Sequence, residues 1–147
     1  MLRRKTAFSL IEVLFAVTFL ILVGVAMSAL NSAAARLVIA GETKLSAYAL
    51  NEQSLAYITI LRKAQGASFS VAPCTVGQTC YVSCPSESLA ANCSLSTEPK
   101  AVQLGRSRLQ YVPEVRVTQS GSSFLLLAKT SWGRGANRSV VSSQLVE

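Results

Sequence analysis

A long apolar segment near the N-terminus constrains this chain more than any other feature of its sequence. From Val13 to Leu30 no residue is charged, and a single carboxylate, Glu12, lies at the start of the segment. A helix of about 20 apolar residues spans the hydrocarbon core of a bilayer. A carboxylate within the bilayer costs about 2.5 to 3.5 kcal/mol on insertion scales, so Glu12 calls for a compensating partner. We therefore predict a helix that can cross a membrane and that carries one acidic residue near its start.

The residues before this segment follow a specific order. A short basic leader, Arg3-Arg4-Lys5-Thr6-Ala7, is followed at once by Phe8-Ser9-Leu10-Ile11-Glu12. This order resembles the prepilin signal of type IV pilins, which usually reads Gly-Phe-Thr-Leu-Ile-Glu, with Ala7 in the place of the glycine. The resemblance implies that a prepilin peptidase removes residues 1–7 by cleaving between Ala7 and Phe8. It also implies that Phe8 becomes the N-methylated N-terminus of the mature chain.

The same resemblance assigns a role to Glu12 and a location to the chain. In this family the glutamate helps to dock a subunit into a growing filament, where it pairs with the N-terminal amine of a neighbour. The expected partners are the prepilin peptidase, other pilins of the filament and the inner-membrane assembly machinery. The basic leader also follows the positive-inside rule. We expect a single-pass inner-membrane protein with a cytoplasmic N-terminus and a periplasmic head, which later enters a pilus or pseudopilus.

Two simpler interpretations of the N-terminal segment stay open at this point. A secretory signal also begins with basic residues, and Ala33-Ala34-Ala35 offers a small-residue cleavage site. However, the apolar core of a secretory signal is only about 7 to 15 residues long, which is shorter than the apolar segment of this chain. A plain membrane anchor explains the apolar segment but not the ordered residues in front of it.

The helix is predicted to continue beyond the apolar segment. Residues 31–65 contain no proline and are rich in helix-forming residues. Leu45, Tyr48, Leu55 and Ile58 recur at heptad-like spacing, which predicts an amphipathic half that a globular head covers. Residues 8–30 then form the transmembrane or assembly half of one long helix, and the head comprises residues 66–147.

The first part of the head, residues 66–99, reads as a loop-rich region with one short strand or helical turn. It holds all four cysteines of the chain, Cys74, Cys80, Cys84 and Cys93. An exported head makes disulfides the default, and two bridges allow three pairings among which the sequence does not choose. The spacing lacks the paired C-x2-C knuckles of zinc sites and the C-x-x-C of redox dithiols. We expect no metal site here.

The second part, residues 100–147, shows the alternation of β-strands. Three strands are predicted within 109–118, 124–132 and 139–146, with turns at 119–122 and 133–137, and Pro113 suggests an edge or a bend. The predicted fold is α+β, with a long N-terminal helix packed on a small antiparallel sheet. The sequence from Thr130 to Gly133 and from Arg138 to Val141 resembles the C-termini of minor pilins of the PilV kind, the type IV pilus modification proteins. It also resembles those of small type II secretion pseudopilins.

The composition argues against an enzyme. The chain has no histidine, which removes the commonest general base, and its glutamates are scattered. We expect no cofactor and no catalytic residue. The alternative to a structural subunit is an adhesin or DNA receptor, because Tyr111 and Trp132 lie among a set of basic residues that could meet phosphates. That set is Arg106, Arg108, Arg116, Lys129, Arg134 and Arg138. A minor pseudopilin of a type II secretion or competence system is the other alternative.

Overall fold

The computed structural model of this chain describes residues 10–66, 69–84, 93–104, 109–133 and 137–146. The predicted cleavage residues Ala7 and Phe8 lie outside the described residues. The chain divides into two compact units, residues 1–41 and residues 42–147, which are described separately below.

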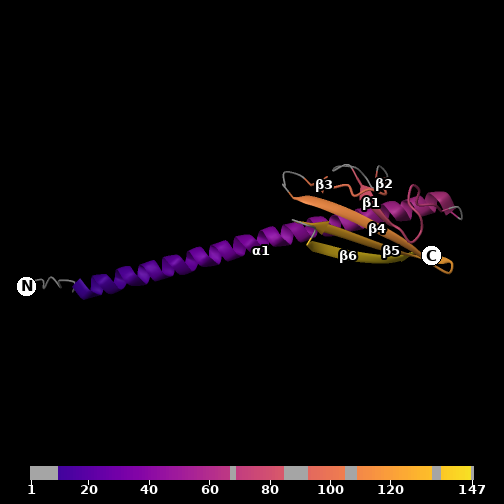
Figure 1. Ribbon diagram of the computed structural model, residues 1–147. Helices are drawn as coiled ribbons and strands as arrows, with labels where there is room; N and C mark the ends of the chain where they lie inside the picture. The colour runs from indigo at the N-terminus through magenta and orange to yellow at the C-terminus, as the bar shows by residue number, and fades with distance from the viewer. Residues whose placement is uncertain (1–9, 67–68, 85–92, 105–108, 134–136, 147) are drawn as a thin grey trace, which may run out of the picture. The chain divides into compact units, whose positions relative to one another are not determined.

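One helix, α1, extends from Leu10 to Gln65 and contributes to both units (Figure 1). Its composition explains its length, because residues 10–65 contain no proline. The helix ends where Gly66 adopts a positive φ of 57°, a left-handed conformation that glycine tolerates and that commonly terminates helices. In the first unit every described residue of α1 is solvent-exposed, including the apolar ones. By length and composition, this helix is suited to cross a membrane, either as an anchor or as a signal.

The second unit contains an antiparallel sheet, which confirms the predicted α+β class. In spatial order the strands are β2, β1, β4, β5 and β6, and the short β3 pairs with β4 beside β1. The strands are β1 (Thr79–Ser83), β2 (Ser94–Ser96), β3 (Val102–Gln103), β4 (Gln110–Ser120), β5 (Ser123–Trp132) and β6 (Arg138–Val146). The three predicted strands correspond to β4, β5 and β6. The sheet is larger than predicted because β1, β2 and β3 extend it beyond β4.

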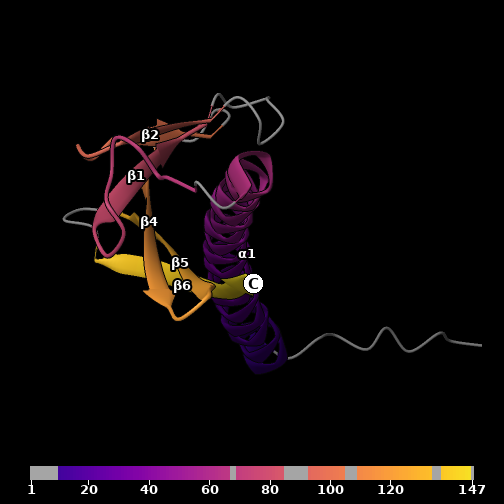
Figure 2. The ribbon, with the colours of Figure 1, turned by 90° about the vertical axis from the view of Figure 1, so that its right-hand side faces the viewer.

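Residues 42–65 of α1 pack on one face of this sheet (Figure 2). Strand alternation places every second side chain toward the helix. The larger core cluster joins Leu55 and Ile58 of the helix to the middle of the sheet and to the cysteines. A smaller cluster holds Ala47, Leu50, Tyr111, Trp132 and Val140.

The buried face of α1 differs from the predicted stripe. Leu55 and Ile58 are buried as expected, but Leu45 is 71% and Tyr48 47% exposed. The buried positions are Ala47, Leu50, Asn51, Ser54, Leu55 and Ile58, which recur at the three- and four-residue spacing of a helix face. This buried face was not recognised from the sequence because two of its residues, Asn51 and Ser54, are polar.

Asn51 lies between the two core clusters and links the helix to the sheet. The Thr130 hydroxyl donates to Asn51 Oδ1 at 2.7 Å. Asn51 Nδ2 donates to the carbonyl oxygen of Val140 at 3.2 Å and to Ser142 Oγ at 3.3 Å. Asn51 is 1% and Thr130 0% exposed, so this is a buried polar network whose groups bond one another.

Pro113 was predicted to mark an edge or a bend, and the edge is excluded because Pro113 lies in the interior strand β4. It sits opposite Thr130 of β5 within β4. On the other side of β4, β3 pairs with residues 110–111 and β1 with residues 114–116. Among the described residues, 112–113 have no strand partner on that side. The missing N–H of the proline therefore costs no ladder bond there, because one neighbouring strand ends and the next begins.

The cysteines pair in sequence order, Cys74 with Cys80 and Cys84 with Cys93. The second bridge directly continues the β1–β2 register, in which Ser83 is opposite Ser94. All four cysteines are buried in the larger core cluster. The disulfides thus form part of the core as well as tying the loops.

Candidate functional site

Glu12 lies in the first turn of α1 and is exposed. A carboxylate at this end of a helix is stabilised by the unpaired N–H groups and by the helix dipole. Within the described part of the chain no cation forms an ion pair with it. Residues 7–9 lie outside that part, so the structure places only the second half of the signal-like sequence.

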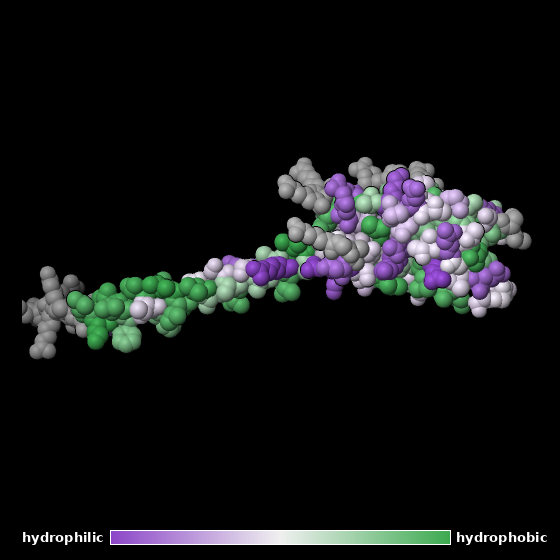
Figure 3. Space-filling model, in the orientation of Figure 1, coloured by the Kyte–Doolittle hydropathy of each residue, from purple (hydrophilic) through white to green (hydrophobic). Residues whose placement is uncertain are grey.

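The residues after Glu12 form an apolar surface around the helix. Leu14, Phe15, Leu20 and Leu22 are each more than half exposed, as are most large apolar residues between them. Figure 3 shows apolar side chains along the visible face of this part of α1. A soluble monomer rarely exposes so large a contiguous apolar surface. Such a surface is suited to contact lipid or the apolar side chains of another helix.

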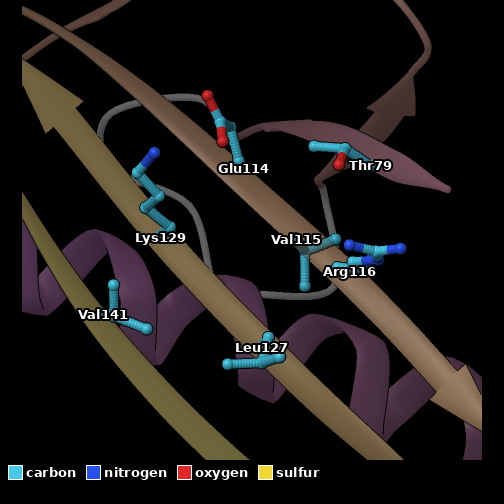
Figure 4. A pocket seen from close by; sticks show the side chains of 7 residues that line it. All are labelled: Thr79, Glu114, Val115, Arg116, Leu127, Lys129 and Val141. Carbon is cyan, nitrogen blue, oxygen red and sulfur yellow. The ribbon is translucent and has the colours of Figure 1, made fainter. Parts of the chain in front are cut away.

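The sheet face away from α1 carries a second candidate surface. A shallow depression of about 200 Å³ lies over β1, β4, β5 and β6, and Figure 4 shows its lining side chains. Glu114 of β4 stands directly opposite Lys129 of β5, and Leu127 and Val141 supply apolar walls. The Arg116 side chain donates to the carbonyl oxygen of Gly77 at 2.9 Å. One carboxylate beside two cations can hold a polar ligand or partner.

The two aromatic residues of the DNA-receptor alternative are buried and cannot stack on bases. Tyr111 is 1% and Trp132 4% exposed, and both belong to the smaller core cluster with ring centroids 6.2 Å apart. Among the basic residues of that alternative, Arg116, Lys129 and Arg138 are exposed, and the other three lie outside the described residues. The aromatic part of that prediction is therefore wrong, because the alternation of β4 and β5 turns both rings into the core.

The cysteines cannot serve as thiolate ligands while they are oxidised, since all four are in disulfides. Among the described residues, no group of three or more histidine, cysteine, aspartate or glutamate side chains is arranged to hold a metal ion.

No family model, curated protein or solved structure matches this chain.

Proposed function

We propose that this protein is a minor type IV pilin, a structural subunit that primes or modifies the assembly of a filament after prepilin peptidase processing. The observation that carries the proposal is the ordered sequence from Ala7 to Glu12 directly before the apolar segment. A helix that continues into a sheet-packed head is the architecture that such a subunit needs, and it supports the proposal. The apolar part holds the subunit in the membrane before assembly, and the head remains outside.

In the proposed mechanism, subunits assemble by packing their apolar helices together, and one ion pair constrains how they align. Cleavage after Ala7 exposes the amine of Phe8, and Glu12 of an adjacent subunit pairs with that amine. A carboxylate among apolar helices is tolerated mainly when an opposite charge satisfies it, so the pair fixes the axial register between subunits. The apolar residues on either side supply the non-directional part of the contact.

Mass spectrometry of the N-terminus tests the processing step. We expect the chain isolated from membranes or filaments to begin at N-methylated Phe8. The matched variant Ala7→Gly, which restores the usual residue of the signal, should be processed at least as completely. A chain that begins at Met1, or after Ala35, would contradict the proposal in favour of a plain anchor or a secretory signal.

Assembly tests the role of Glu12. We expect Glu12→Ala to remove the protein from the sheared filament fraction while its amount in the inner membrane is unchanged. Glu42→Ala is the matched control, because it removes an exposed glutamate from the same helix. Normal incorporation of Glu12→Ala would refute the docking role. If deletion of the gene abolished protein secretion and left pili intact, the chain would belong to a type II secretion pseudopilus instead.

A further inference from the structure

Helix α1 and strand β6 run in the same direction through the second unit. The chain enters this unit at Glu42. Asn51 bonds the carbonyl oxygen of Val140 near the start of β6. Further along the helix, Arg62 bonds the carbonyl oxygen of Val146 at the end of β6. The first residues of β6 therefore lie at the end of the unit where α1 enters, which we call the entry end.

The helix-facing side of the sheet carries an arginine at the entry end. Thr130 faces α1, because its hydroxyl bonds Asn51. Side chains two apart along a strand share a face, so Trp132 faces the helix as well. Arg138 is directly opposite Trp132 in the β5–β6 ladder and shares its face. Trp132 is buried in the smaller core cluster, whereas Arg138 is exposed, so Arg138 lies at the rim of the contact between helix and sheet.

Lys44 approaches the same rim from the helix. It is three residues before Ala47 and seven before Asn51, and these positions lie on one helix face. Lys44 thus continues the sheet-facing stripe beyond its first buried residue, and it is exposed. Lys44 lies about 10 Å before Asn51 along the helix. Arg138 lies about 7 Å before Val140 along β6, so both cations project past the core in the same direction.

The entry end supplies positive charge and a free donor without a matching anion. Within the described residues neither cation has an ion-pair partner. Glu42 is two positions from Lys44, and residues two apart on a helix do not face each other. The described ends of β4, β5 and β6 on this side, residues 109–111, 131–133 and 137–139, include no carboxylate. The indole N–H of Trp132 is buried and has no acceptor in the described part of the chain.

The helix that precedes the entry end has the length of a bilayer. Residues 10–41 are helical and extend about 48 Å at 1.5 Å per residue. A bilayer with its headgroups is about 40 to 45 Å thick, and tilts of about 20° are common. Large exposed apolar residues continue as far as Ile39. A helix of this length that crosses the membrane emerges among the outer headgroups near Glu42, where the second unit begins.

We propose that the entry end of the head binds the phosphate of an anionic phospholipid through Lys44 and Arg138. A guanidinium binds phosphate oxygens in a bidentate manner, and an ammonium adds a mobile point charge. Each basic residue near an anionic membrane surface strengthens binding by about fivefold. The bound headgroup holds the head against the membrane before assembly. This inference rests on the membrane insertion in the proposed function, but not on cleavage or on filament assembly.

The test uses the full chain reconstituted in phosphatidylcholine vesicles. Phosphatidylglycerol or phosphatidylcholine with a spin label near the top of the acyl chain is titrated in, and quenching of Trp132, the only tryptophan, reports labelled lipid at the entry end. We expect labelled phosphatidylglycerol to quench at least about fivefold more strongly than labelled phosphatidylcholine at low salt. Lys44→Gln and Arg138→Gln should each reduce this preference, and high salt should remove it.

Lys63→Gln is the matched control, because it removes an exposed cation from the last turn of the same helix, and we expect no change. Equal quenching by the two lipids, an unchanged preference in the double variant, or an equal loss in Lys63→Gln would each overturn the proposal. Competition by inorganic phosphate at matched concentration would also overturn it, in favour of a site for free phosphate.

Two controls keep the outcomes separate. Carbonate extraction shows whether the chain is inserted in the vesicles; failure to insert contradicts the proposed function, whereas insertion without a lipid preference contradicts only this inference. Circular dichroism on each variant keeps a folding defect from being read as lost lipid binding. If Arg138→Gln is misfolded, Lys44→Gln decides, because Lys44 lies on the exposed part of the helix before its first buried residue.

Discussion

The buried network around Asn51 allows a quantitative prediction about what holds the helix on the sheet. Asn51 and Thr130 are almost fully buried, and each depends on the other for a 2.7 Å hydrogen bond. Asn51→Leu keeps the approximate volume but removes this bond and the two longer ones to β6. The Thr130 hydroxyl is then left buried without its partner.

The expected cost follows from these contacts. Stranding a buried hydroxyl costs about 1 to 3 kcal/mol, and the two longer bonds contribute about 1 kcal/mol together. The leucine recovers about 1 kcal/mol through burial of apolar surface. We expect Asn51→Leu to lower the free energy of unfolding by about 2 kcal/mol, which corresponds to a fall of about 10 °C in the unfolding temperature for a domain of this size.

A double-mutant cycle separates the network from simple packing. Thr130→Val removes the stranded hydroxyl, so Asn51→Leu combined with Thr130→Val should be less destabilised than Asn51→Leu alone. We expect a coupling energy of about 1 to 2 kcal/mol between the two positions. Thr118→Val makes the same chemical change on the exposed face of β4 and should change stability by less than about 0.5 kcal/mol.

The assay is denaturant unfolding followed by the fluorescence of Trp132. It is the only tryptophan of the chain and lies in the neighbouring core cluster, so it reports on the contact between helix and sheet. A coupling energy within error of zero, or an Asn51→Leu variant more stable than the wild type, would refute the proposed contribution of the network.

Two further stability predictions concern the ends of the second unit. The Arg62 guanidinium lies 4.8 Å from the centroid of the Phe124 ring and also donates to the last carbonyl of β6, so Arg62→Met should destabilise by about 1 to 2 kcal/mol in thermal unfolding. The neighbouring substitution Lys63→Met should be nearly neutral, and equal losses would argue against these contacts. Replacing Cys84 and Cys93 with alanine should cost about 2 to 4 kcal/mol in urea unfolding, and no loss would exclude a stabilising role for this bridge.

Much of the second unit follows from local sequence. The alternation of residues in 109–118, 124–132 and 139–146 located β4, β5 and β6, because one buried sheet face imposes a period of two. The turn at Gly121, which has a positive φ of 62°, fixed the β4–β5 hairpin. The short strands β1 to β3 were not located, because segments of so few residues are too short to show a periodic pattern.

The buried face of α1 and the cysteine pairing depended on distant residues. Asn51 reads as a surface residue until Thr130 and Val140 provide its partners, and these lie far away in the sequence. The pairing of Cys84 with Cys93 follows the β1–β2 register, and this register cannot be predicted from local composition.

The candidate sites also separate into features set by local sequence and features set by contacts between distant residues. The apolar helix and the position of Glu12 at its start are predictable from the sequence, because both depend on consecutive residues and on the cost of charge in an apolar medium. In contrast, the burial of Tyr111 and Trp132 in the core and the place of β6 at the edge of the sheet result from tertiary packing. An edge is a property of strand order, and strand order is set by packing between segments that are far apart in the chain.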